Sequence, residues 1–161
     1  MSFIESVLSI WDVNRERTLE TLDAIEQLED PQAALAFRPG SGRAHIAWQL
    51  MHIAVTEALF ATSRFLGTDP AFPERCEQFQ RGSVASDDNV PTLAEIRDTL
   101  AQSREHLKAT MAKFSEEDLE SMPGILADRG WTLRRALQII TWHEGHHQGQ
   151  AHVTLNVFKA K

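Results

Sequence analysis

Four long segments of the sequence repeat apolar residues at the spacing of an α-helix, and none alternates apolar and polar residues as a half-buried strand does. These segments cover residues 2–27, about 44–66, about 92–114, and 132 almost to the C-terminus. Four amphipathic helices without a strand can bury their apolar faces only against one another. We therefore predict an all-α protein in which residues 1–161 form a single four-helix bundle domain, a length that suits one core.

Short signals mark where the helices begin. Thr92 and Glu95 have the spacing of a capping box, and Thr132 precedes the last periodic segment. Residues 67–91 lack periodicity and hold three of the six prolines. This stretch is predicted to be a long connection, which is either a functional cover or a mobile loop.

Composition and charge exclude several classes of protein. The chain carries 23 acidic and 16 basic residues, a net charge of −7, and no long basic run, which argues against a nucleic-acid partner. Glu5 and Asp12 interrupt the apolar N-terminal stretch, and no apolar run is long enough for a membrane span. The single cysteine, Cys76, excludes an intrachain disulfide and fits a reducing compartment. We expect a cytoplasmic protein without a membrane partner.

The stretch WHEGHHQGQAH, residues 142–152, holds four of the seven histidines. His143 and His147 lie one helical turn apart and continue an apolar stripe, so both imidazoles can reach one ion. His146 lies on the flank of that stripe and could replace either, whereas His152 points to the far side of the helix. The alternative is that these are hydrogen-bonded interior histidines without a metal.

The letters HEGHH also match the H-E-x-x-H pattern of zinc proteases. Such sites take a third protein ligand downstream of the motif. Only fourteen residues follow His147, none of them Asp or Glu, and the extended pattern meets Gln150 and Val153 instead of Gly and His. The protease interpretation fails, and we expect Glu144 to be exposed or at the rim of the site.

A third ligand must then come from upstream, where the second helix offers His45 and His52. These lie seven residues apart, so only one can easily join a given ion. His52 lies deep among apolar residues, so the predicted ligands are His52, His143 and His147, unless His52 only packs in the core. Neutral imidazoles favour zinc as the divalent ion, with nickel also plausible.

Three further residues are candidates for the surroundings of the site. Gln49 lies one turn before His52, and Gln150 follows His147, so either can hydrogen-bond a metal ligand or a substrate. Arg104 interrupts the apolar stripe of the third helix. It is expected either to face the pocket as an anion contact or to extend along the bundle edge.

The segments HIAWQLMHIAVTE and HEGHHQGQ, on the second and last helices, resemble the DinB/YfiT-like superfamily of small metalloenzymes. The resemblance covers nearly the whole chain and implies a bundle of up-down-down-up topology. It also implies a divalent metal held by three histidines, here His52, His143 and His147. Gln148 stands where the familiar motif has a basic residue, which affects a surface contact rather than coordination.

The resemblance implies a class of function. Characterised members include metal-dependent transferases that use small thiols such as bacillithiol, mycothiol or glutathione, and an isomerase that uses such a thiol. The favoured hypothesis is a thiol-dependent transferase or related detoxifying enzyme that acts on a small-molecule substrate. A metal-dependent hydrolase and a non-catalytic metal-binding stress-response module are the alternatives.

Gly145 and Gly149 interrupt the last helix, where each destabilises the helix by about 1 kcal/mol relative to Ala. Missing side chains there allow another backbone to approach closely. That backbone belongs either to a neighbouring helix or to a second subunit, and we predict a homodimer.

Overall fold

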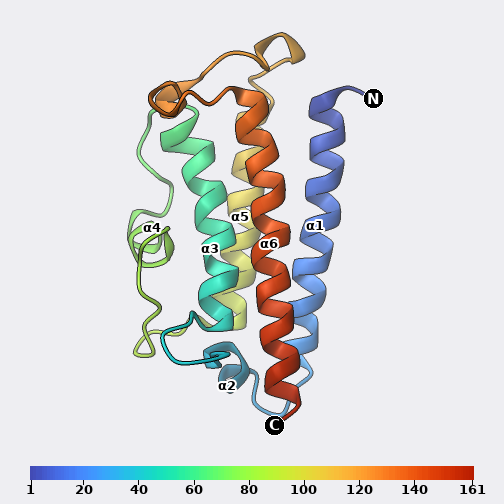
Figure 1. Ribbon diagram of the computed structural model, residues 1–161, viewed down its shortest axis with the longest axis vertical. Helices are drawn as coiled ribbons and strands as arrows, with labels where there is room; N and C mark the ends of the chain where they lie inside the picture. The colour runs from blue at the N-terminus through green and yellow to red at the C-terminus, as the bar shows by residue number, and fades with distance from the viewer.

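The computed structural model describes residues 1–161 and contains helices but no strands, which confirms the predicted all-α class. Four long helices lie side by side (Figure 1): α1 (Phe3–Glu26), α3 (Ile46–Leu59), α5 (Leu93–Met111) and α6 (Leu133–Lys159). The connections hold two short α-helices, one π-helical segment and two 3-10 turns: α2 (Pro31–Ala36), α4 (Pro73–Phe79), η1 (Phe60–Arg64), η2 (Glu116–Asp118) and η3 (Gly124–Arg129).

The directions of the four helices follow an up-down-down-up order. In Figure 1, α1 and α6 run downward while α3 and α5 run upward. Contacts agree, because Ser103 hydrogen-bonds Glu57 and, further along both helices, Thr110 hydrogen-bonds the Ala61 carbonyl. Parallel neighbours need a connection that returns along the bundle, and residues 67–91 provide it.

Side-chain caps fix the beginnings of three helices. Ser2 with Glu5 and Thr92 with Glu95 form reciprocal capping boxes at α1 and α5. The Thr132 hydroxyl accepts a hydrogen bond from the Arg135 amide at the start of α6. The helix starts predicted at residues 92 and 132 are therefore confirmed.

Two elements differ from the sequence-based expectation. The second helix was predicted to run unbroken to about residue 66, but α3 ends at Leu59 and continues as the π-helical η1. The 67–91 connection contains α4, which Pro73 begins and which packs on α3 through the buried Cys76 and Phe79. This connection is thus an ordered cover on α3.

The buried apolar side chains form two clusters, one towards each end of the bundle. Between them lies a layer of polar residues at about the same height on all four long helices, comprising Arg15, His52, Glu57, Arg104, His143, Glu144 and His147. Burying polar groups is unfavourable unless they are paired or bind a ligand. This polar layer is therefore the candidate location of the functional site.

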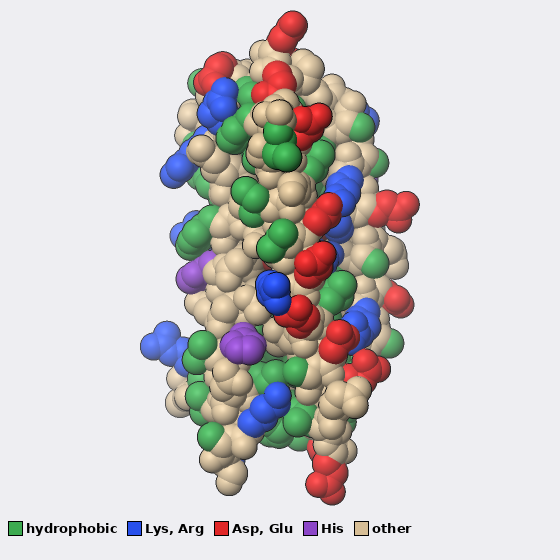
Figure 2. Space-filling model, turned by 90° about the vertical axis from the view of Figure 1, so that its right-hand side faces the viewer, with side chains coloured by type: hydrophobic (Ala, Val, Ile, Leu, Met, Phe, Trp, Pro, Cys, Tyr) green, Lys and Arg blue, Asp and Glu red, His purple; other side chains and the backbone are tan.

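Charges of both signs are distributed over the surface. On the face seen in Figure 2, acidic and basic side chains are interspersed, with apolar ones scattered among them. No uniform basic surface of the kind that tracks a phosphate backbone covers this face. None of the helices is apolar over a length sufficient to cross a bilayer.

Candidate metal centre

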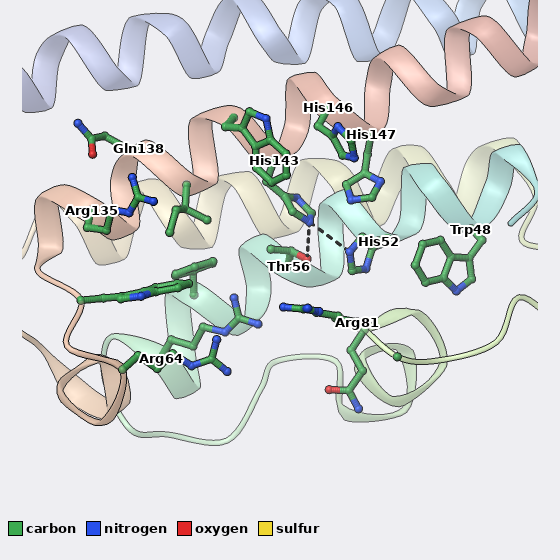
Figure 3. Close-up of a pocket in the computed structure, with 17 residues that line it drawn as sticks. Trp48, His52, Thr56, Arg64, Arg81, Arg135, Gln138, His143, His146 and His147 are labelled. Carbon is green, nitrogen blue, oxygen red and sulfur yellow. Dashed lines mark hydrogen bonds between the residues drawn. The ribbon is translucent and has the colours of Figure 1, made fainter. Parts of the chain in front are cut away.

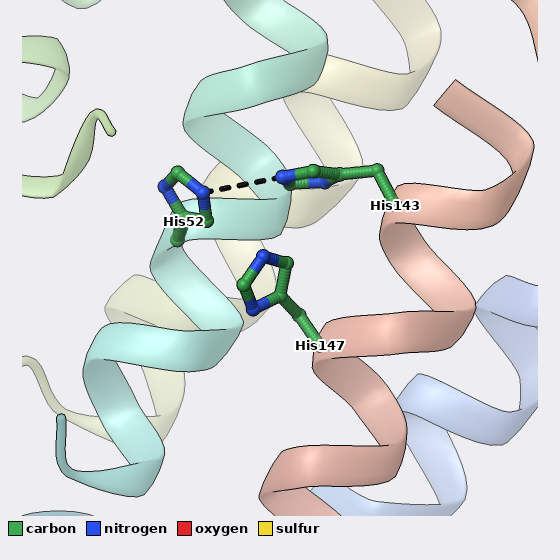
Figure 4. A group of neighbouring side chains, drawn as sticks. All are labelled: His52, His143 and His147. Atoms are coloured by element: carbon green, nitrogen blue, oxygen red, sulfur yellow. Dashed lines mark hydrogen bonds between the residues drawn. The ribbon is translucent and has the colours of Figure 1, made fainter. Parts of the chain in front are cut away.

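Three histidines from two helices converge in the middle layer. His52 comes from α3, and His143 and His147 come from consecutive turns of α6 (Figure 4). One ring nitrogen from each lies within 4.8 Å of the others, and the Nε2 atoms of His52 and His143 are 3.1 Å apart. No cysteine, carboxylate or fourth histidine joins the group. The structure thus brings together the three residues that the sequence predicted as ligands.

Hydrogen bonds at the outer ring nitrogens orient two of the three imidazoles. Nδ1 of His52 donates to the Phe79 carbonyl at 2.5 Å, and Nδ1 of His147 donates to Gln49 Oε1 at 2.6 Å. A proton on Nδ1, assigned from these acceptors, leaves the Nε2 lone pair free. This is the arrangement of metal-binding histidines, whose second nitrogen is held by a carbonyl or carboxyl group.

The electrostatic surroundings keep these rings neutral. Burial, then the proximity of His147 and His52, lowers the pKa of His143 to about 2. Burial and His52 lower the pKa of His147 to about 4, and burial also lowers the pKa of His52. Because neutral imidazole is the form that ligates a metal, the three rings are ready to bind at pH 7. Their number, chemistry and spacing fit one divalent ion.

The other candidate histidines have different roles. His45 caps α3, since its Nδ1 accepts a hydrogen bond from the Trp48 amide. His146 stacks on Trp142 and contacts Gln150, so Gln150 is linked to the rim of the site. His152 is exposed, as expected.

Glu144 and Arg104 contradict the sequence-based expectation. Glu144 was expected at the rim, but its side chain is only 2 % exposed and binds Arg15 and Arg104. Arg104 was expected at the pocket or the bundle edge, but it is buried and pairs with Glu57 and Glu144. Helical spacing predicts the direction in which each side chain leaves its own helix. It does not predict which side chains of neighbouring helices lie in that direction.

These four residues form a buried ion network with one member from each long helix: Arg15, Glu57, Arg104 and Glu144. Thr18 and Ser103 donate further hydrogen bonds to the carboxylates, and no buried side-chain nitrogen or oxygen lacks a partner. Burial opposes the charge on Arg104, but the two carboxylates outweigh it and raise its pKa. Glu144, the catalytic base in H-E-x-x-H proteases, is thus a structural residue that fixes α6 next to His143.

A cavity of about 930 Å³ opens beside the three histidines (Figure 3). Its wall includes Thr56, whose Oγ1 lies 3.4 Å from His143 Nε2, and the aromatic rings of Trp48 and Trp142. Its volume is in the range that holds a small organic molecule. No aspartate or glutamate lines it, whereas four arginines do: Arg64, Arg81, Arg129 and Arg135.

Sequence reasoning did not identify these arginines or the Phe79 carbonyl as parts of the site. The arginines lie in two distant parts of the chain, residues 64–81 and residues 129–135, and a carbonyl carries no residue-specific signal. Arg64, the one basic residue after His52 in the second predicted helix, was the sequence signal that could have indicated a cation near the site.

The family model of the DinB superfamily matches residues 10–151 of the chain. The match includes most of the bundle and all three clustered histidines. Comparisons with curated proteins and with solved structures found no match.

Proposed function

The chain belongs to the DinB superfamily, and we propose that it is a metal-dependent enzyme that transfers a small thiol to an electrophilic substrate. The observation that carries this proposal is the opening of the three-histidine cluster onto a cavity of small-molecule size. Zinc is the favoured ion and nickel the second choice, because both accept imidazole nitrogen. A divalent ion held by His52, His143 and His147 would lower the pKa of a thiol bound to it and so supply a thiolate at neutral pH.

Residues of the chain itself perform the remaining tasks. Gln49 and the Phe79 carbonyl hold His147 and His52 in orientation. Thr56 places a hydroxyl on the cavity wall next to His143, where it can hydrogen-bond a reacting group. The rings of Trp48 and Trp142 provide apolar surface on the cavity wall. A cavity of about 930 Å³ also leaves room for a thiol and a second reactant together.

The two alternatives have less support. A metal-dependent small-molecule hydrolase would gain from a carboxylate base beside its activated water, but no carboxylate lines the cavity and Glu144 is bound to two arginines. A structural metal site is usually closed by a fourth protein ligand, and no fourth candidate lies in this cluster.

A matrix of low-molecular-weight thiols and electrophiles tests the proposed reaction. We expect the zinc- or nickel-loaded protein to accelerate electrophile consumption, and we expect chelation to abolish the acceleration. His147→Ala should be inactive, whereas His152→Ala, at an exposed position of the same helix, should remain active. Turnover that persists without any thiol would assign the site to hydrolysis instead.

The reaction also agrees with the proposed cytoplasmic location, since small thiols stay reduced there. Cys76 is free and buried, and burial raises the pKa of its thiol, so it is not an alternative nucleophile.

The proposed homodimer remains a prediction. A Cβ on Gly145 would lie 3.9 Å from the Asn14 side chain of α1, which is an ordinary contact, and no atom lies within 4 Å of a Cβ position on Gly149. Packing within the bundle therefore requires neither glycine. We expect light scattering at micromolar concentration to give about twice the chain mass of 18.1 kDa. Gly149→Leu should then favour the monomer, and a wild-type mass near that of one chain would refute the dimer.

A further inference from the structure

The cavity beside the histidines gathers four arginines that have no acidic partner. Arg64 ends η1, Arg81 follows α4, Arg129 ends η3, and Arg135 lies in the first turn of α6. None of the four forms an ion pair, and no guanidinium among them makes a hydrogen bond within the protein. In Figure 3, Arg64 and Arg81 extend into the space in front of His143 and Thr56.

Arg64 is half-buried in the cavity wall, and Arg81, Arg129 and Arg135 are exposed at its opening. The arginines that do form ion pairs lie elsewhere: Arg15, Arg17, Arg38, Arg97, Arg104 and Arg134. The protein as a whole has a net charge of −7, yet the cavity wall contains four cations and no carboxylate. Positive groups gathered in a concave site repel one another and attract an anion.

The fold holds part of this cluster in place. The Arg64 guanidinium lies 4.3 Å from the Phe60 ring centre, and Arg129 lies 5.3 Å from that of Trp131. Gly124 has a positive φ, and a Cβ there would lie 2.3 Å from the Arg64 carbonyl oxygen. Glycine therefore permits η3 to pack directly against the backbone of η1, which keeps Arg129 beside Arg64.

The pKa of Arg64 is lowered by its burial and by the neighbouring positive charge. Burial, followed by the charge of Arg129, lowers its pKa to about 10, so it remains protonated at neutral pH. The guanidinium is thus a desolvated cation without a counter-charge in the protein. An anion would supply that counter-charge and accept paired hydrogen bonds from the N–H groups at the edge of the guanidinium plane.

We propose that Arg64, Arg81, Arg129 and Arg135 form an anion-binding subsite that selects a reactant carrying at least two carboxylate or phosphate groups. This inference rests on the proposed function, because the subsite would place such a reactant beside the three histidines. The cavity volume of about 930 Å³ fits a ligand of small-molecule size.

Anion binding can be measured on the metal-free protein, which separates this proposal from the reaction itself. The protein is stripped with a chelator that is then removed by gel filtration. It is titrated with succinate, pyrophosphate and, as a neutral match, succinamide. Calorimetry reports binding, and fluorescence of the cavity residues Trp48, Trp131 and Trp142 reports its location. We expect at least one dianion to bind and succinamide not to bind.

Single Arg→Gln variants at the four positions should each weaken dianion binding roughly tenfold or more, as expected for lost charge-assisted hydrogen bonds. Arg43→Gln is the matched control, because Arg43 is exposed, lies outside the cavity and forms no ion pair. It removes the same charge and should leave affinity unchanged. Arg64→Lys, which keeps the charge, should bind better than Arg64→Gln if the fold tolerates both, as circular dichroism would show.

The relative affinity for succinate and pyrophosphate identifies the anionic group. Equal affinity in the wild type and all four variants would overturn the subsite, as would succinamide binding as tightly as succinate. Dianion binding that depends on the four arginines, combined with no thiol-transfer activity, would retain the subsite and reject the proposed reaction.

Discussion

His143→Ala is expected to lower the affinity for a divalent ion by more than about 100-fold, beyond the range typical of changes to groups that merely support a ligand. The physical reason is geometric: His143 Nε2 lies 3.1 Å from His52 Nε2, and its loss leaves only two nitrogens in the cluster. Competition titration with a chromogenic chelator, with metal analysis of the purified protein, measures the change.

Two other variants serve as comparisons for the metal affinity of His143→Ala. His146→Ala changes a neighbouring histidine that stacks on Trp142, and it should retain affinity within a few-fold. Gln49→Ala removes the acceptor for His147 Nδ1 and should weaken binding by about 10- to 100-fold. Stoichiometric metal in purified His143→Ala, held as tightly as in the wild type, would show that the cluster is not the metal site.

Glu144→Ala is expected to lower the free energy of unfolding by about 3–5 kcal/mol, the usual effect of removing one partner from a buried ion pair. Arg15 and Arg104 would then share only Glu57, leaving an uncompensated positive charge between four helices. Thermal unfolding of the metal-free protein should show a decrease in Tm on the order of 10 °C.

Glu120→Ala provides the matched control. Its partner is Arg134, both side chains are exposed, and such surface pairs contribute about 0–1 kcal/mol. The double variant Glu144→Leu with Arg104→Met removes one charge of each sign and should be less destabilised than the sum of the two single changes. If Glu144→Ala and Glu120→Ala unfold at the same temperature, the buried network does not stabilise the fold as described.

The sequence determined the local parts of this protein. Apolar periodicity located the four long helices, and capping residues such as Thr92 and Thr132 located two of their starts. The spacing of His143 and His147 also defines a local geometry, because one helical turn places both rings on the same face. His52 could be selected because it lay within an apolar helix.

Only the tertiary structure decided which side chains meet across helices. Glu144 lies next to His143 in the chain, but it is buried because Arg15, Glu57 and Arg104 arrive from three other helices. The same holds for the Phe79 carbonyl at His52, since the 67–91 connection packs back on α3.

The four arginines of the cavity also come together only through the tertiary structure. Arg64 and Arg135 are separated by about half the chain, and each resembles an ordinary surface or helix-end cation in the sequence. A helical repeat specifies the direction of a side chain around its own axis, whereas contacts between segments depend on how the helices pack and how the connections fold back. The sequence therefore determined the helices and identified the three histidines that cluster, and the packing of distant segments decided the ion network and the charge of the cavity.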